Sequence, residues 1–197
     1  FSKHPFRRSF LLIVLCWLPY IIAFYPIILS PDPSYQIKQF FGIRTKYADY
    51  AVLLDENVVL TNHHPVAHTV LLGGCLKIGH ELGSDNLGLF IYSIIQICVL
   101  ASVLSFTISY LKKRNVPDRY LFLMLLIYAL VPMFPLYAMS GVKDVLFTAF
   151  VILYLIMTHA ILSKRCQNFS AKHYIAMIVL MLLVILFRNN GLYMIIL

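Results

Sequence analysis

Long apolar segments recur along this chain, and they limit what it can fold into. A helix that crosses a bilayer needs about 20 mostly apolar residues, and it satisfies its own backbone polar groups. We predict about five membrane-spanning helices, in the stretches Phe10–Leu29, Asn86–Leu111, Tyr120–Met139, Asp144–Leu162 and Tyr174–Phe187. Because Leu192–Leu197 starts another apolar segment, we expect residues 1–197 to be the N-terminal transmembrane domain of a larger fold.

The composition supports an all-α, polytopic membrane protein. Hydrophobic residues make up 61% of the chain and charged residues 12%, and a soluble domain has roughly twice that charged fraction. The net charge of +8 would suggest nucleic-acid binding in a soluble protein. Here it follows more simply from the retention of Lys and Arg on the cytoplasmic side of membrane proteins. We therefore expect the lipid bilayer as a partner, and no nucleic acid.

The distribution of charges predicts the orientation. With a cytoplasmic N-terminus, 10 of the 16 Lys and Arg residues fall on inner segments and 6 on outer ones. Seven of the eight acidic residues fall outside, and Asp118 is the exception. This asymmetry is typical of short cytoplasmic loops. We predict that residues 30–85, 139–143 and 188–191 face the extracytoplasmic side.

Residues 30–85 form a polar outer loop that we expect to carry the functional site. Within it, Pro65–Ile78 is apolar but too short to cross a bilayer, so we predict an interfacial helix that begins at Pro65. A second short interfacial helix is predicted around Asp32–Gly42, where aromatic residues suit the headgroup region. The two helices would hold the polar residues of the loop at the membrane surface.

Asp32 is the candidate catalytic residue. It follows Pro31 at the outer end of the first predicted span. One interpretation is structural, because the sequence Pro-Asp-Pro-Ser is typical of a turn. The other is chemical, because a carboxylate at a partly desolvated boundary can act as a general base or a metal ligand.

Three histidines surround the start of the predicted interfacial helix. His63 and His64 directly precede Pro65, and His68 lies one turn after His64. A helix N-terminus favours anions such as phosphate, so we predict that these residues bind substrate. A metal-dependent hydrolase is a weaker alternative, because the spacing lacks the glutamate of zinc proteases. A purely structural interfacial role is the third interpretation.

Four further residues are predicted to lie on the same membrane face. Lys143 and Asp144 precede the fourth predicted span, while Arg188 and Asn189 follow the fifth. Each has a structural interpretation as a helix end. Together, however, the cations could hold a lipid-linked phosphate while a carboxylate performs acid–base chemistry. We therefore predict substrate-binding roles for all four.

Several short motifs resemble known membrane proteins. They are Tyr25-Pro26, Ser30-Pro31-Asp32, Asn62-His63-His64-Pro65, His68-Thr69, the run from Lys143 to Phe147 and the run from Arg188 to Gly191. In this order they resemble a bacterial multi-span family, domain of unknown function 6020. More distantly they resemble the C-type glycosyltransferases, which include protein O-mannosyltransferases and lipid A aminoarabinose transferases.

The resemblance implies that a sugar is transferred from a polyprenyl-phosphate donor to an acceptor outside the bacterial cytoplasmic membrane. Asp32 would match the acidic loop residue that serves as base, and His63-His64-Pro65 would occupy the place of a His-Pro-Pro element. The chain lacks the second acidic residue of the mannosyltransferases, which leaves a divalent cation open as a cofactor. A transporter or flippase for a lipid-linked or anionic substrate is the alternative function.

Overall fold

The computed structural model describes residues 3–49, 59, 61, 63–163 and 170–196. The described residues form helices and no strand, which confirms the all-α prediction. The helices are α1 (Pro5–Ala23), α2 (Pro31–Phe40), α3 (Lys46–Asp49), α4 (Val66–Glu81), α5 (Asp85–Lys113), α6 (Asp118–Leu130), α7 (Met133–Ala138), α8 (Asp144–Ser163), α9 (Ala171–Phe187) and α10 (Gly191–Ile196).

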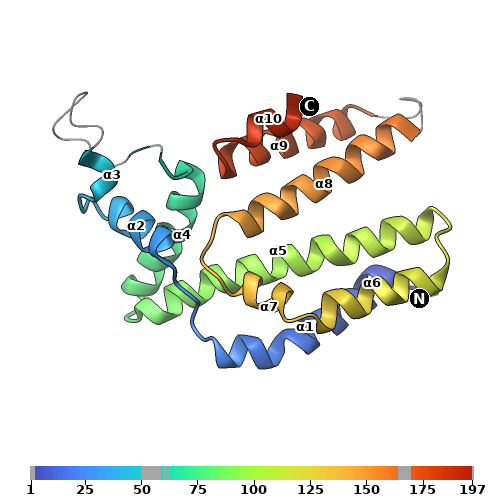
Figure 1. The fold of residues 1–197 in the computed structure, drawn as a ribbon, viewed down its shortest axis with the longest axis horizontal. Coiled ribbons are helices and arrows are strands. Elements are labelled where there is room, and N and C mark those ends of the chain that lie inside the picture. The colour runs from blue at the N-terminus through green and yellow to red at the C-terminus, as the bar shows by residue number, and fades with distance from the viewer. Residues whose placement is uncertain (1–2, 50–58, 60, 62, 164–169, 197) are drawn as a thin grey trace.

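Helix α5 forms the centre of the bundle and contacts α1, α4, α6, α7 and α8. Figure 1 shows α2, α3 and α4 gathered at one end of the long helices, while the turn between α5 and α6 lies at the other end. Helices α2, α3 and α4 of the predicted outer loop therefore lie at the opposite end of the molecule from the basic turn at residues 112–119.

A buried tryptophan joins the first helix to the rest of the bundle. Trp17 is fully buried in a cluster that includes Ile13 of α1, Leu104 of α5 and Leu121 of α6. Its indole N–H donates a hydrogen bond to the carbonyl of Tyr128 at 3.0 Å. This bond satisfies the one polar atom of a side chain that otherwise stabilises the core by burying apolar area.

Three helices are long and apolar enough to cross a membrane: α1, α5 and α8. Helix α9 is apolar but shorter, at 17 residues. Large apolar side chains such as Ile22, Leu162 and Ile175 point outward with 59–75% of their surface exposed. Such surfaces are unfavourable in water and suit lipid. The chain is therefore a membrane protein.

Two predicted spans differ from the helices, and proline accounts for the clearer difference. The stretch Tyr120–Met139 is divided into α6 and α7 at Val131 and Pro132. Proline lacks a backbone N–H and disfavours helical geometry in the preceding residue, and Val131 accordingly has extended backbone angles. The first predicted span, Phe10–Leu29, is helical only as far as Ala23.

The residues after α1 pair with the segment before α8 and bring these two connections together. The N–H of Ile28 donates to the carbonyl of Met139 at 2.9 Å, and the N–H of Gly141 donates to the carbonyl of Ile28 at 3.0 Å. The side-chain amide of Gln96, in α5, donates to the carbonyl of Ser140 at 2.6 Å. These bonds fix the approach to both α2 and α8.

The two predicted short helices of the outer loop are present as α2 and α4. Helix α4 is 16 residues long and begins at Val66, so Pro65 caps the helix instead of occupying its first position. Residues 50–58, 60 and 62 of this loop lie outside the described part of the chain. The described helices nevertheless place both the aspartate and the histidines of the loop.

Glycine allows α4 and α5 to approach closely at their turn. A Cβ added to Gly79 would lie 2.1 Å from the backbone nitrogen of Gly88, whereas one added to Gly74 would meet no atom within 4 Å. We expect Gly79→Ala to lower the free energy of unfolding by about 1–3 kcal/mol through overpacking. Gly74→Ala should raise it by up to about 1 kcal/mol, because alanine loses less backbone entropy in a helix. Thermal unfolding of the purified variants in detergent checks the pair, and equal stabilities would contradict the close contact.

Candidate functional site

A polar pocket of about 280 Å³ lies where the ends of α4, α8 and α9 meet. It is lined by His63, Pro65, Lys143, Arg188, Asn189 and Asn190. These residues come from three separate stretches of the chain, and four of them were predicted to bind substrate. The pocket joins two formal cations with amide and imidazole groups, a combination suited to an anion.

Arg188 is held at the pocket by two neighbours. It ends α9, and its Nη1 lies 2.9 Å from the Oδ1 of Asp144, the first residue of α8. Its guanidinium group also lies over the ring of Phe147, 5.1 Å from the ring centre. The side chains of Arg188 and Asp144 remain 43% and 34% exposed, so an incoming anion can reach the guanidinium. Asp144 thus positions Arg188 and does not itself line the pocket.

Contacts around His63 close the other side of the pocket. The side-chain amide of Asn189 donates to the carbonyl of His63 at 3.5 Å. The ring of Tyr47, in α3, stacks on the His63 ring with 3.9 Å between their centres, and it meets the His64 ring edge-on at 5.1 Å. Aromatic packing therefore holds both imidazoles at the start of α4.

His64 is a buried imidazole without a polar partner. Only 1% of its surface is exposed, and neither ring nitrogen has a hydrogen-bond partner in the described part of the chain. Burial, with smaller contributions from Lys143 and His63, lowers the pKa of His64 to about 4, and Asp32 opposes the shift. His64 is therefore neutral at pH 7, and its electrostatic environment includes both Lys143 and Asp32.

Asp32 lies in the first turn of α2 with an exposed side chain. The start of this helix packs near the segment before α8, since a Cβ on Gly141 would lie 3.3 Å from the Cβ of Pro33. Asp32 is not among the residues that line the polar pocket. It belongs to the same end of the molecule, where its charge opposes the lowering of the His64 pKa.

His68 was predicted to bind substrate, but the structure places it behind the pocket. It is fully buried, its Nδ1 bonds to Gln36 Oε1, and its Nε2 lies 2.7 Å from the hydroxyl of Tyr92. Burial, followed by Lys143 and His64, lowers the pKa of His68 to about 3. A neutral ring that donates from Nδ1 and accepts at Nε2 satisfies both bonds. His68 therefore connects α2, α4 and α5.

This buried network also anchors the helix that carries Asp32. Gln36 lies one turn after Asp32 on α2, and residues one turn apart share a helix face. The bond between Gln36 and His68 therefore fixes this part of α2 against α4.

The family of the chain follows from its match over residues 6–197 to DUF6020, a family of unknown function. The chain belongs to this family. Searches of curated proteins and of solved structures give no match. The family match confirms the narrower of the two resemblances drawn from the motifs, while the link to C-type glycosyltransferases remains an expectation.

Metal binding by three histidines does not fit the arrangement in this DUF6020 chain. Both ring nitrogens of His68 are already hydrogen-bonded. Among the described residues, no group of three or more His, Cys, Asp and Glu side chains could hold a metal ion. The described residues therefore do not support a metal centre built on the three histidines.

Some residues of this site gave no distinct signal in the sequence. Tyr47 packs on the ring of His63, but no repeating sequence pattern relates these two positions. Asn190 directly follows Asn189, which was predicted to bind substrate, and the same prediction could have included Asn190. Gln36 could have been found from one sequence signal, its position one turn after Asp32 in a predicted helix.

Proposed function

We propose that this DUF6020 protein is a glycosyltransferase of the bacterial cytoplasmic membrane. An acceptor hydroxyl attacks the anomeric carbon of a sugar on a polyprenyl-phosphate donor, and the bond between that carbon and the phosphate oxygen breaks. Asp32 takes the hydroxyl proton as general base, and the polyprenyl phosphate leaves as an anion. The anomeric configuration is inverted. The phosphate charge is stabilised by Lys143, by Arg188, and by His63 together with the nearby start of α4.

The observation that carries this proposal is the convergence of Lys143, Arg188, Asn189 and His63 around one pocket. A phosphate needs several donors within reach, and these residues come from α4, α8 and α9 or their flanking turns. The helix start at Val66 adds free backbone N–H groups and a positive dipole end.

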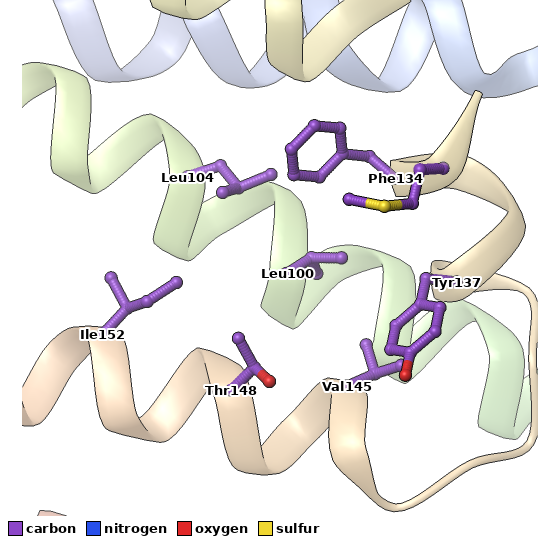
Figure 2. Close-up of a pocket in the computed structure, with 8 residues that line it drawn as sticks. Leu100, Leu104, Phe134, Tyr137, Val145, Thr148 and Ile152 are labelled. Carbon is purple, nitrogen blue, oxygen red and sulfur yellow. The ribbon is translucent and has the colours of Figure 1, made fainter. Parts of the chain in front are cut away.

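An apolar cavity supports a lipid-linked donor. It has a volume of about 340 Å³ and lies between α5, α7 and α8, with Leu100, Leu104, Phe134, Tyr137 and Ile152 among its lining residues (Figure 2). One wall begins at Val145, two residues after Lys143. An isoprenoid chain in this cavity would gain by burying apolar area, while its phosphate reaches the polar pocket.

The proposed orientation places the N-terminus in the cytoplasm. The turn between α5 and α6 carries Lys112, Lys113, Arg114 and Arg119 and lies at the opposite end from α2, α3 and α4 (Figure 1). Basic residues favour the cytoplasmic side. The polar pocket then faces the extracytoplasmic side, where polyprenyl-linked sugars would meet their acceptors.

A vesicle assay separates this proposal from the transporter or flippase alternative. Full-length protein is reconstituted with polyprenyl-phosphate-linked mannose, glucose or aminoarabinose, each radiolabelled in the sugar, together with an extract of envelope lipids and glycans. We expect the label of one donor to move to a product that resists mild acid, because a glycosidic bond survives conditions that cleave the sugar phosphate. Translocation of intact donors between leaflets without such a product would overturn the glycosyltransferase and favour the flippase.

A further inference from the structure

A second pocket with cationic walls lies at the end of the molecule remote from the polar pocket. It has a volume of about 370 Å³ and lies between the end of α5, the end of α8 and the start of α9. Its lining residues are Tyr110, Lys113, Arg114, Met157, Ala160, Ser163 and His173. Since α5 and α8 are long enough to cross a membrane, their ends mark the level of a bilayer surface.

An apolar cavity adjoins this cationic pocket. Its volume is about 460 Å³, and it shares Tyr110 and Arg114 with the cationic pocket. The other lining residues are Thr107, Leu111, Leu155, Ile156 and His159. Leu155 and Ile156 lie about two turns before the end of α8, so this cavity extends from the surface toward the membrane interior.

Arg114 is held in place at the junction of the two cavities. Its guanidinium group lies over the ring of Tyr110, 5.8 Å from the ring centre. The hydroxyl of Tyr110 lies 2.5 Å from Nδ1 of His159 in a hydrogen bond, and Arg114 Nη2 lies 3.4 Å from the same nitrogen. These contacts orient the guanidinium without neutralising its charge.

The sequence provides little negative charge at this end. Between residues 86 and 143 the only acidic residue is Asp118, and residues 145–197 contain none. Asp118 forms an ion pair with Lys112, and the Nζ of Lys112 lies 2.5 Å from the Oδ1 of Asp118. Within the described part of the chain, Lys113 and Arg114 pair with no carboxylate, so both charges are available to a bound anion.

We propose that these two cavities bind an anionic phospholipid. The headgroup phosphate contacts Lys113 and Arg114 in the cationic pocket, and an acyl chain lies along Leu155 and Ile156 in the apolar cavity. Basic pockets between membrane helices recognise lipid headgroups in this way. A soluble anion would use the cations alone, whereas the lipid also buries the apolar wall. In the proposed orientation the lipid belongs to the cytoplasmic leaflet.

Lipid binding to the purified full-length protein in detergent tests this proposal. The probes are phosphatidylglycerol, phosphatidylcholine and inorganic phosphate, and the readout is the bound fraction by native mass spectrometry. We expect phosphatidylglycerol to bind more tightly than phosphatidylcholine and inorganic phosphate not to displace it. The double variant K113Q/R114Q should bind phosphatidylglycerol roughly 25-fold more weakly, at about fivefold for each lost cation.

The neighbouring lysine provides the matched control. Lys112 is in the same turn of α5 but pairs with Asp118, so Lys112→Gln should leave lipid affinity within about twofold, because it lies outside the headgroup contacts. If the double variant does not fold, Lys113→Gln alone, at an exposed position, should still show the fivefold loss. Equal binding of the two lipids, displacement by inorganic phosphate, or an equal loss in Lys112→Gln would each overturn the proposal.

Discussion

Replacing Asp32 with asparagine is expected to lower the rate of sugar transfer by a factor of about 10²–10⁴, the usual contribution of a general base. Asparagine keeps the size of the side chain but cannot take the proton of the acceptor hydroxyl. Asp32 lies in the first turn of α2, where a carboxylate contributes only about 0.3–1 kcal/mol through the helix dipole. Asp32→Asn should therefore fold normally, and donor binding should stay within about twofold of the native value.

A second aspartate at a helix start serves as the control for this experiment. Asp85 lies in the first turn of α5 and contacts His80 at 2.8 Å, away from the polar pocket. Asp85→Asn should leave the rate of transfer unchanged. Transfer retained in Asp32→Asn would remove Asp32 from the mechanism. A loss in both variants would indicate a general effect of charge on the membrane face.

The helices of this fold could be predicted from the sequence where the length of an apolar segment is enough to define the helix. The stretch Asn86–Leu111 lies inside α5, and Asp144–Leu162 lies inside α8. The break at Pro132 was harder to predict, because membrane helices tolerate proline when neighbouring groups satisfy the freed carbonyl. Which outcome occurs depends on tertiary contacts, and these are not visible in a local pattern.

The sequence placed several of the pocket's residues on one face, but it did not predict their pairings. Common membrane sidedness suggested that Lys143 and Arg188 lie on one face, and they do line one pocket. Membrane sidedness does not give distances between side chains, so the ion pair between Arg188 and Asp144 could not be predicted from it. For the same reason His68 was grouped with His64, although both ring nitrogens of His68 are hydrogen-bonded and those of His64 are not, within the described part of the chain.

Loss of a cation from the polar pocket is expected to weaken binding of the donor strongly. Lys143→Gln should raise the dissociation constant for the polyprenyl-phosphate donor about 10- to 150-fold, because a hydrogen bond to a charged group contributes about 1.5–3 kcal/mol. Lys77→Gln is the control, because Lys77 is exposed on α4 and does not line the pocket. Equilibrium binding of a fluorescent donor to detergent-purified protein measures both, and equal affinities would contradict the phosphate site.

Arg188 allows a sharper test, because its partner carries a negative charge. Arg188→Gln removes a cation and leaves Asp144 beside the phosphate without the partner it contacts at 2.9 Å. The loss of affinity should therefore exceed that of Lys143→Gln. Adding Asp144→Asn removes the repulsion and should restore affinity by on the order of tenfold. If the ion pair were purely structural, the second substitution would lower donor affinity further. Recovery of affinity in the double variant therefore supports a phosphate site.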